Sequence, residues 1–191
     1  MLSPGFTTLS FVPLTVFEAA NMVLGDALYD VHVVTAGGGS LANSFGMAIE
    51  TQSISDFEFD TILVGSPPDA QPAPEGMLAA LKDAPSKYRR VASICVGAFI
   101  LGQAGLLDDR RSTTHWMFGE ELQARYPRTR VEIDRIFIAD GPIWTSAGMT
   151  AGIDMALGLV EHDLGRDLAR ETAGRWWSIT GARAGNRSTR R

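Results

Sequence analysis

Continuous apolar runs in the first half of the chain predict buried β-strands. They span residues 29–39, 59–69 and 89–97, and each ends at or near a glycine. Runs without polar alternation are typical of strands buried on both faces, as in a parallel sheet. Residues 131–148 alternate instead and carry an Asp140-Gly141 pair, which predicts a β-hairpin.

Helical spacing of apolar residues fills the intervals between these strands. It predicts helices over residues 13–25, 74–84 and 115–127. Residues 150–177 predict one or two further helices with a break at Gly165. Strands that alternate with helices predict an α/β fold with a mostly parallel sheet. Functional sites of such folds lie at the carboxyl ends of the strands, so the turns after the strands are the candidate sites.

Composition and charge restrict the class of protein. The chain has 191 residues, of which 45% are hydrophobic, and this suits one compact domain. Its net charge of −5 argues against a protein that grips a phosphate backbone by itself. No apolar run approaches the ~18–20 residues of a membrane span, and no secretory leader is visible at the start. We therefore expect no membrane partner.

The single cysteine and three histidines restrict the chemistry further. One cysteine permits no internal disulfide, which predicts a cytoplasmic protein. The histidines and the cysteine are scattered without metal-ligand spacing, so no metal and no cofactor are expected.

The cysteine lies in the stretch Ser-Ile-Cys-Val-Gly at residues 93–97. Small residues at Ser93 and Gly97, two before and two after Cys95, are what a nucleophile elbow requires, because larger side chains would clash across the turn. The start of the next helix would then favour the thiolate and lower the pKa of the cysteine. The alternative interpretation is a small buried residue at the end of a strand.

Two further segments carry candidate polar groups. In RSTTHWMF, His115 is predicted at a loop–helix junction, where it either faces a site or caps and packs. In TSAGMTAGID, at residues 145–154, backbone N–H groups could bind an anion or a carbonyl, or the small residues could serve close packing.

These segments together resemble the ThiJ/PfpI superfamily, whose fold is glutamine-amidotransferase-like. The resemblance rests on SICVGAFILGQAGLLDDRRSTTHW and on RVEIDRIFIADGPIWTSAGMTAGIDMALGLVE. It implies a flavodoxin-like three-layer sandwich, commonly dimeric, with Cys95 at the elbow and His115 close to it as the candidate catalytic pair. The ligand-binding residues expected from it are Cys95, Val96, Gly65, Ser66, His115, Ser146, Ala147 and Gly148.

Within that superfamily the chain is most similar to the sensor domain of AraC-type (GlxA-like) regulators. The expected organisation is a single domain over residues 1–178, a disordered basic tail over 179–191, and no helix-turn-helix domain, so DNA would be reached only through a domain absent from this chain. Two features depart from the superfamily pattern. Only residues 1–3 precede the first turn, which implies a shortened first strand, and Ser10 stands where enzymatic members often carry an acid.

Three functions follow from these observations. A ligand-sensing regulatory domain, pairing as a homodimer, would bind a small molecule over Cys95 without turnover. A cysteine-dependent hydratase, amidase or glyoxalase-like enzyme would use Cys95 as nucleophile and His115 for proton exchange. A redox sensor would oxidise Cys95. The missing acid at Ser10 and the regulator-like second half favour the sensing domain over the enzyme.

Overall fold

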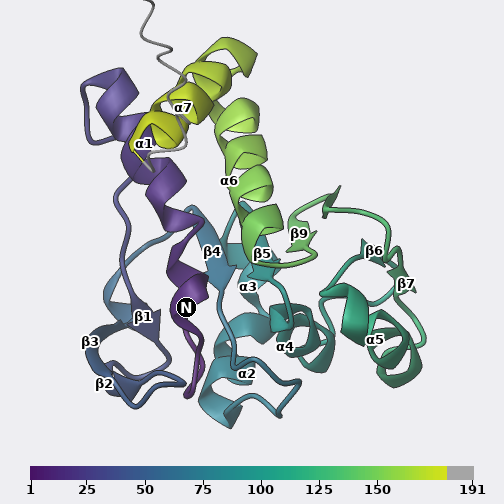
Figure 1. Ribbon diagram of the computed structural model, residues 1–191. Coiled ribbons are helices and arrows are strands. Elements are labelled where there is room, and N and C mark those ends of the chain that lie inside the picture. The colour runs from purple at the N-terminus through teal and green to yellow at the C-terminus, as the bar shows by residue number, and fades with distance from the viewer. Residues whose placement is uncertain (180–191) are drawn as a thin grey trace, which may run out of the picture. The chain divides into compact units, whose positions relative to one another are not determined.

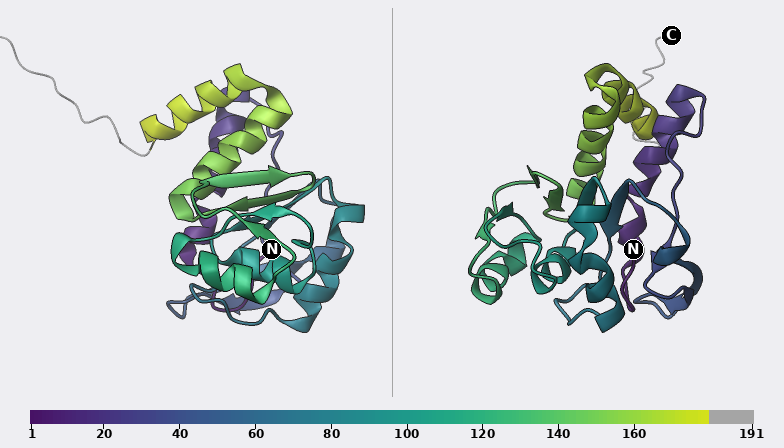
Figure 2. Two further views of the ribbon diagram at one scale, coloured as in Figure 1. Left: turned by 90° about the vertical axis from the view of Figure 1, so that its right-hand side faces the viewer. Right: turned by 180° about the vertical axis from the view of Figure 1, so that it is seen from behind.

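The computed structural model describes residues 1–179, which divide into two compact units (Figures 1 and 2). The first unit comprises Met1–Pro13 and His32–Met155, and the second comprises Leu14–Val31 and the chain from Ala156 onward. The basic tail expected over 179–191 lies outside the described residues from residue 180 onward.

The main sheet of the first unit has the strand order β4-β5-β9-β8. Strands β4 (Thr61–Val64), β5 (Arg90–Ile94) and β9 (Ile143–Ser146) are parallel, and β8 (Phe137–Asp140) is antiparallel to β9. All five residues of β5 are buried, including the polar residues Arg90 and Ser93, as expected for a strand covered on both faces. The predicted hairpin is confirmed, and Gly141 supplies the positive φ of its turn.

Two smaller sheets complete the first unit, and with them the fold contains mixed sheets. The order in one is β1-β3-β2, with β1 (Val34–Thr35) parallel to β3 (Ala48–Ser53) and β2 (Gly39–Ala42) antiparallel to it. The other pairs β6 (Arg111–Ser112) with β7 (Arg130–Val131) in parallel.

The strand predicted over residues 29–39 is wrong in its extent, since only two of its residues form β1. Its neighbour on one side is the short segment before the first turn, in which the Leu2 N–H donates to Val34 O at 2.9 Å. Leu2 also forms an isolated parallel bridge with Gly65, at the end of β4. Val34 thus lies between this segment and β3.

The helices of the first unit pack around these strands and enclose one hydrophobic core. The predicted helix at 74–84 is confirmed, whereas the one at 115–127 begins as a 3₁₀ turn. Every residue from Gly97 to Gly102 of α4 is apolar and buried, whereas Gln103 at the end of the helix is exposed. The helices and turns are η1 (Thr8–Phe11), η2 (Ile54–Asp56), α2 (Glu75–Lys82), α3 (Ala84–Lys87), α4 (Gly97–Gln103), η3 (Trp116–Phe118) and α5 (Gly119–Arg125).

The second unit is helical. Helix α1 (Leu14–Leu24) packs against α7 (Arg166–Ile179), and the Trp176 Nε1–H donates to Thr15 Oγ1 at 2.7 Å. Helix α6 (Met149–Leu164) begins in the first unit and continues into the second. The predicted break at Gly165 is confirmed, because this residue takes a φ of +86° between α6 and α7.

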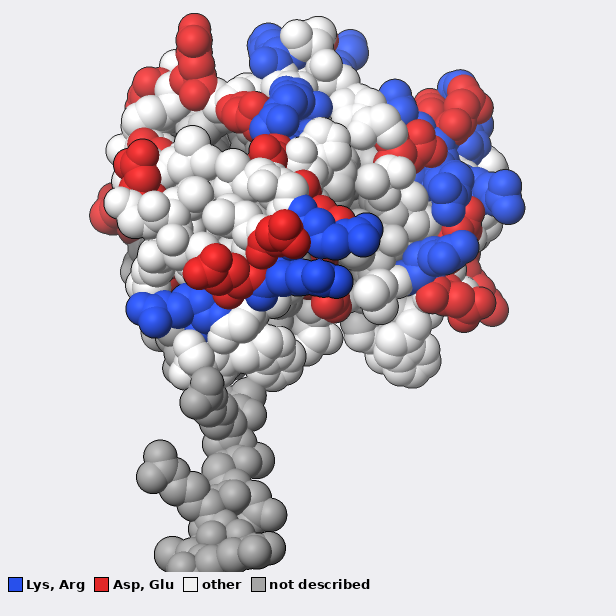
Figure 3. Space-filling model, turned by 90° about the horizontal axis from the view of Figure 1, so that it is seen from above, with Lys and Arg blue, Asp and Glu red and all other residues white. Residues whose placement is uncertain are grey.

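Charged side chains of both signs are interspersed on the surface. Figure 3 shows one face, on which Lys and Arg side chains lie beside Asp and Glu side chains and do not form a continuous basic surface. Within residues 1–179, no helix is long and apolar enough to cross a membrane.

Candidate functional site

Three turns of the first unit meet at the carboxyl edge of the main sheet. They follow the adjacent parallel strands β4, β5 and β9, in which Val64 pairs with Ser93 and Ile94 pairs with Ser146. The Cys95 N–H donates to Ser146 O at 3.0 Å, so the second and third turns are directly joined. This edge brings together the predicted residues Gly65, Ser66, Cys95, Val96, Ser146, Ala147 and Gly148.

The backbone of Cys95 adopts a left-handed conformation between β5 and α4, with a φ of +56°. Asp109 is the other non-glycine residue with a positive φ among residues 1–179. An aspartate tolerates this region through local hydrogen bonds, whereas a cysteine has no such compensation, and such strain is typically about 1–3 kcal/mol. Strain of this kind persists only where the surroundings impose it, which makes the Cys95 turn a candidate site.

The small residue at Gly97 has a direct steric cause. A Cβ atom placed there would lie 2.9 Å from Val64 O and 3.4 Å from the Ser93 Cβ. The close approach of α4 to β4 and β5 therefore needs a glycine at this position, as the spacing around Cys95 predicts.

The thiol of Cys95 is half-buried, and its pKa departs from the sequence-based expectation. Burial raises the pKa of the thiol, and the hydrogen bond from the Val96 N–H to the sulfur opposes that rise without reversing it. The expected lowering by the helix N-terminus is therefore wrong. The loss of hydration outweighs the one hydrogen bond that the sulfur receives at the start of α4, from the Val96 N–H.

His115 lies at the loop–helix junction, as predicted. Its Nδ1 accepts from the Met117 N–H at 3.4 Å, which caps η3, and its ring packs against Trp116 and Phe118. Its Cδ2 lies 3.6 Å from where a Cβ of Gly148 would be, so the imidazole borders the third turn. Among the described residues, no hydrogen bond joins His115 to the Cys95 sulfur, which leaves the predicted pair without a direct proton path in this structure.

Ser10 is buried in η1. Its Cβ and Oγ lie 2.8 Å from the position that a Gly65 Cβ would take, so this corner has space only for a short side chain beside a glycine.

Nowhere in residues 1–179 do three or more His, Cys, Asp or Glu side chains gather as a metal site would require.

One contact at the site was not assigned from the sequence. The Thr114 hydroxyl, fully buried, donates to Cys95 O at 2.9 Å. The TTHW segment identified this threonine as a neighbour of His115, but only the fold brings it to the strained turn, 19 residues earlier in the chain.

We predict that a substitution of Ser93, next to the Cys95 turn, increases the stability of the fold. Its hydroxyl is fully buried and has no hydrogen-bond partner. We expect Ser93→Ala to raise the free energy of unfolding by about 1 kcal/mol, because the unpaired hydroxyl is removed. Urea denaturation measures this.

Ser146→Ala is the matched control for that measurement. The Ser146 hydroxyl donates to Ser93 O at 3.3 Å, so its removal should lower stability by about 0.5–1.5 kcal/mol. A loss of stability in Ser93→Ala would contradict the prediction.

Comparison with known proteins gives one family match and several related sequences. The DJ-1/PfpI family model matches residues 10–162. The HTH-type transcriptional regulator CdhR of Pseudomonas aeruginosa is 34% identical over 174 residues, covering 88% of this chain and 51% of the regulator. GlxA of Rhizobium meliloti, also an HTH-type regulator, is 30% identical over 181 residues, covering 91% and 55%. The chain thus spans about half the length of these relatives.

An enzyme and two solved structures are also similar. The isonitrile hydratase of Pseudomonas putida is 35% identical over 96 residues, covering 50% of this chain and 41% of the enzyme. An AraC family transcriptional regulator from Pseudomonas putida superposes with a TM-score of 0.79 at 24% identity, covering 91% of this chain and 95% of that structure. Drosophila melanogaster DJ-1beta gives a TM-score of 0.69 at 19% identity, covering 91% and 92%. Both structures show the same α/β fold.

Proposed function

The chain belongs to the DJ-1/PfpI family, and on that premise we propose that it is a ligand-sensing regulatory domain that binds a small molecule at the Cys95 turn. Similarity to the N-terminal domains of AraC-type regulators over about nine-tenths of the chain supports this function. The proposal includes a flavodoxin-like three-layer arrangement of the domain over residues 1–178.

The observation that carries the proposal is the φ of +56° at Cys95, on a turn at the carboxyl edge of parallel strands. We assign this turn as a nucleophile elbow in geometry, which presents the thiol to a ligand. The turns after β4 and β9 flank it and would supply backbone groups to the same ligand. The contacts we propose are Cys95, Val96, Gly65, Ser66, His115, Ser146, Ala147 and Gly148.

Binding without turnover fits the chemistry of this edge better than catalysis does. The pKa of the Cys95 thiol is raised by burial, so the thiolate is disfavoured at neutral pH. Ser10, beside Gly65, supplies no carboxylate that could hold a proton. Among the described residues, therefore, neither a base hydrogen-bonded to the sulfur nor a carboxylate at the position of Ser10 is available to activate Cys95.

The experiment that tests the proposal is a thermal-shift screen of the purified chain against common small metabolites, followed by calorimetry. We expect a compound that raises Tm, and we expect His115→Ala to weaken its binding. Steady turnover of an alkyl isonitrile, a primary amide or methylglyoxal that is lost in Cys95→Ala would contradict the proposal.

A cysteine-dependent enzyme is the second candidate, and the similarity to the isonitrile hydratase favours it. In that function Cys95 would attack an electrophilic carbon and His115 would exchange protons. The reactivity of the thiol distinguishes the two functions, because nucleophilic catalysis needs an available thiolate.

We predict that iodoacetamide alkylates Cys95 at pH 7 more slowly than it alkylates a cysteine in an unstructured peptide. Burial raises the pKa of the thiol, which lowers the thiolate fraction, and also limits access to the sulfur. Mass spectrometry of timed samples gives the rate, with the urea-unfolded chain as the matched control. Faster alkylation in the folded chain would favour the enzyme.

The partners belong to the same proposal. We propose a homodimer in the cytoplasm, supported by the exposed apolar side chains of Trp116 and Met117 next to His115. DNA would be contacted only through a helix-turn-helix domain such as the matched regulators are named for. Light scattering of the purified chain tests the dimer, and a monomeric mass at micromolar concentration would contradict it.

A further inference from the structure

The two backbone polar groups of Cys95 are both held from outside its own turn. The N–H donates to Ser146 O at 3.0 Å, and the carbonyl accepts from Thr114 Oγ1 at 2.9 Å. Within the turn, the carbonyl has one longer contact, 3.4 Å from the Ala98 N–H. A residue with a positive φ relaxes unless such contacts hold it, and only the contact from Thr114 comes from a side chain.

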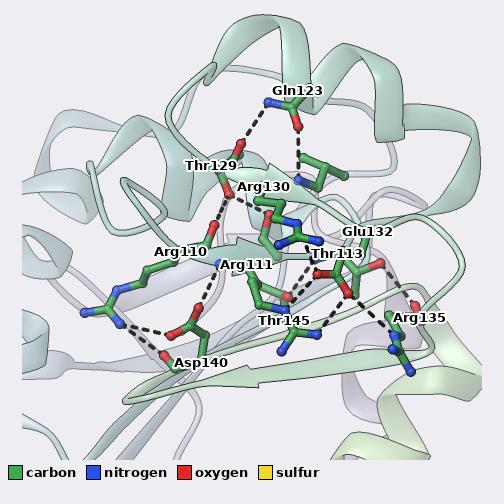
Figure 4. Close-up of polar contacts among 12 residues, drawn as sticks. Arg110, Arg111, Thr113, Gln123, Thr129, Arg130, Glu132, Arg135, Asp140 and Thr145 are labelled. Carbon is green, nitrogen blue, oxygen red and sulfur yellow. Dashed lines mark hydrogen bonds and ion pairs between the residues drawn. The ribbon is translucent and has the colours of Figure 1, made fainter.

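The position of Thr114 is itself fixed by neighbouring elements. The N–H of Thr113 donates to Thr145 Oγ1 at 2.8 Å, and the Thr113 hydroxyl donates to Arg135 O at 3.1 Å. Figure 4 shows these residues approaching one another from the end of β6, from β9 and from the loop before β8. The chain immediately before Thr114 is therefore held from two sides.

Strand β6, which leads into this segment, is held by ionic contacts. The Arg111 guanidinium pairs with Glu132 at 2.7 Å, and the Arg111 N–H donates to Asp140 Oδ2 at 2.8 Å (Figure 4). The hydrogen bond from Arg111 lowers the pKa of the Glu132 carboxyl to about 2. This pair therefore keeps its charges through the pH range in which a thiol titrates.

We propose that Thr114 is a positioning residue, whose hydroxyl holds the peptide of Cys95 in its left-handed conformation and thereby keeps the sulfur in line with the Val96 N–H. The inference deepens the proposed function, since it concerns the presentation of the same thiol. A hydroxyl at 2.9 Å, fully buried and aimed at the one strained cysteine, supports this role.

The test is the pH–rate profile of Cys95 alkylation, measured without any ligand. In Thr114→Val the turn relaxes and the thiolate loses its alignment with the Val96 N–H, so the midpoint of the profile should move upward by roughly half a pH unit or more. Thr114→Ser keeps the hydroxyl and should restore the midpoint of the unsubstituted protein. His115 is a titratable side chain that borders the same edge, so the series is repeated with His115→Gln.

Thr129→Val is the matched control. Thr129 is also buried and also donates its hydroxyl to a carbonyl at 2.9 Å, that of Arg110 (Figure 4). Its hydroxyl also pairs with the buried Ser112 hydroxyl at 2.9 Å, so Thr129→Val perturbs β6 without touching the Cys95 carbonyl. It should lose at least as much stability as Thr114→Val and leave the midpoint unchanged. An unchanged or lowered midpoint in Thr114→Val, or an equal rise in Thr129→Val, overturns the assignment.

Two provisions keep the outcome interpretable. If Thr114→Val does not fold, the comparison of Thr114→Ala with Thr114→Ser answers the same question, because only the second keeps a hydroxyl. Since no ligand enters the assay, a failed ligand screen would count against the proposed function alone. An unchanged alkylation midpoint in Thr114→Val would count only against the positioning role of Thr114.

Discussion

Gly97→Ala should lower the free energy of unfolding by about 1–3 kcal/mol, because the added methyl group has no space. Its Cβ would lie 2.9 Å from Val64 O, which is a main-chain atom of β4 and cannot rotate away. Relief requires α4 to move away from the sheet, and Cys95 is the residue two positions before the substitution. Urea denaturation measures the loss of stability.

The control is the same substitution in a helix with free space. A Cβ at Gly174, exposed in α7, has nothing within 4 Å. Gly174→Ala should therefore raise the stability by about 0.5–1 kcal/mol through its helix propensity. Equal effects of the two substitutions would show that the contact with Val64 does not restrict Gly97.

Elements with a local cause could be predicted from the sequence. Gly25 takes a φ of +69° after α1, and Gly165 takes +86° between α6 and α7. Each glycine therefore ends a helix at the position that the sequence pattern predicts. The Asp140-Gly141 pair forms the turn of the β8–β9 hairpin. In each case the residue type and its immediate neighbours determine the backbone conformation.

Features that depend on partners far along the chain could not be predicted. The strand at Val34 has two residues, and its partners are β3, about 18 residues later, and the segment around Leu2, about 30 residues earlier. The hairpin of β2 and β3 is local, but its residues are mostly exposed. The less exposed positions of β3 include Thr51 and Ser53, so no apolar alternation marks the strand in the sequence.

The candidate site also has some features with a local cause and others that depend on residues far along the chain. The small residues around Cys95 indicated its turn, since the steric requirement is local. The rise of its pKa depends on burial by the assembled fold, and the Thr114 contact depends on a threonine 19 residues away. Sequence patterns thus locate the thiol, whereas its electrostatics and anchoring require the tertiary structure.

Leu101→Ala should lower the free energy of unfolding by about 2–5 kcal/mol, which is the largest loss we expect from a single truncation. Leu101 lies in α4, is fully buried, and belongs to the hydrophobic core. Because all the residues from Gly97 to Gly102 are buried, the cavity cannot fill by a small rotation of the helix toward solvent. Leu9→Ala, in the exposed part of η1, is the control and should change stability by less than about 0.5 kcal/mol.

The same variant separates global stability from local positioning. Leu101→Ala leaves both external hydrogen bonds of Cys95 in place, from its N–H to Ser146 O and from Thr114 Oγ1 to its carbonyl. We therefore expect the alkylation midpoint of Cys95 to stay unchanged, measured where circular dichroism shows the variant to be folded. Leu101→Met, which conserves volume, substitutes if the alanine variant unfolds. A raised midpoint in either would mean that core packing, and not the Thr114 hydroxyl, determines the state of the thiol.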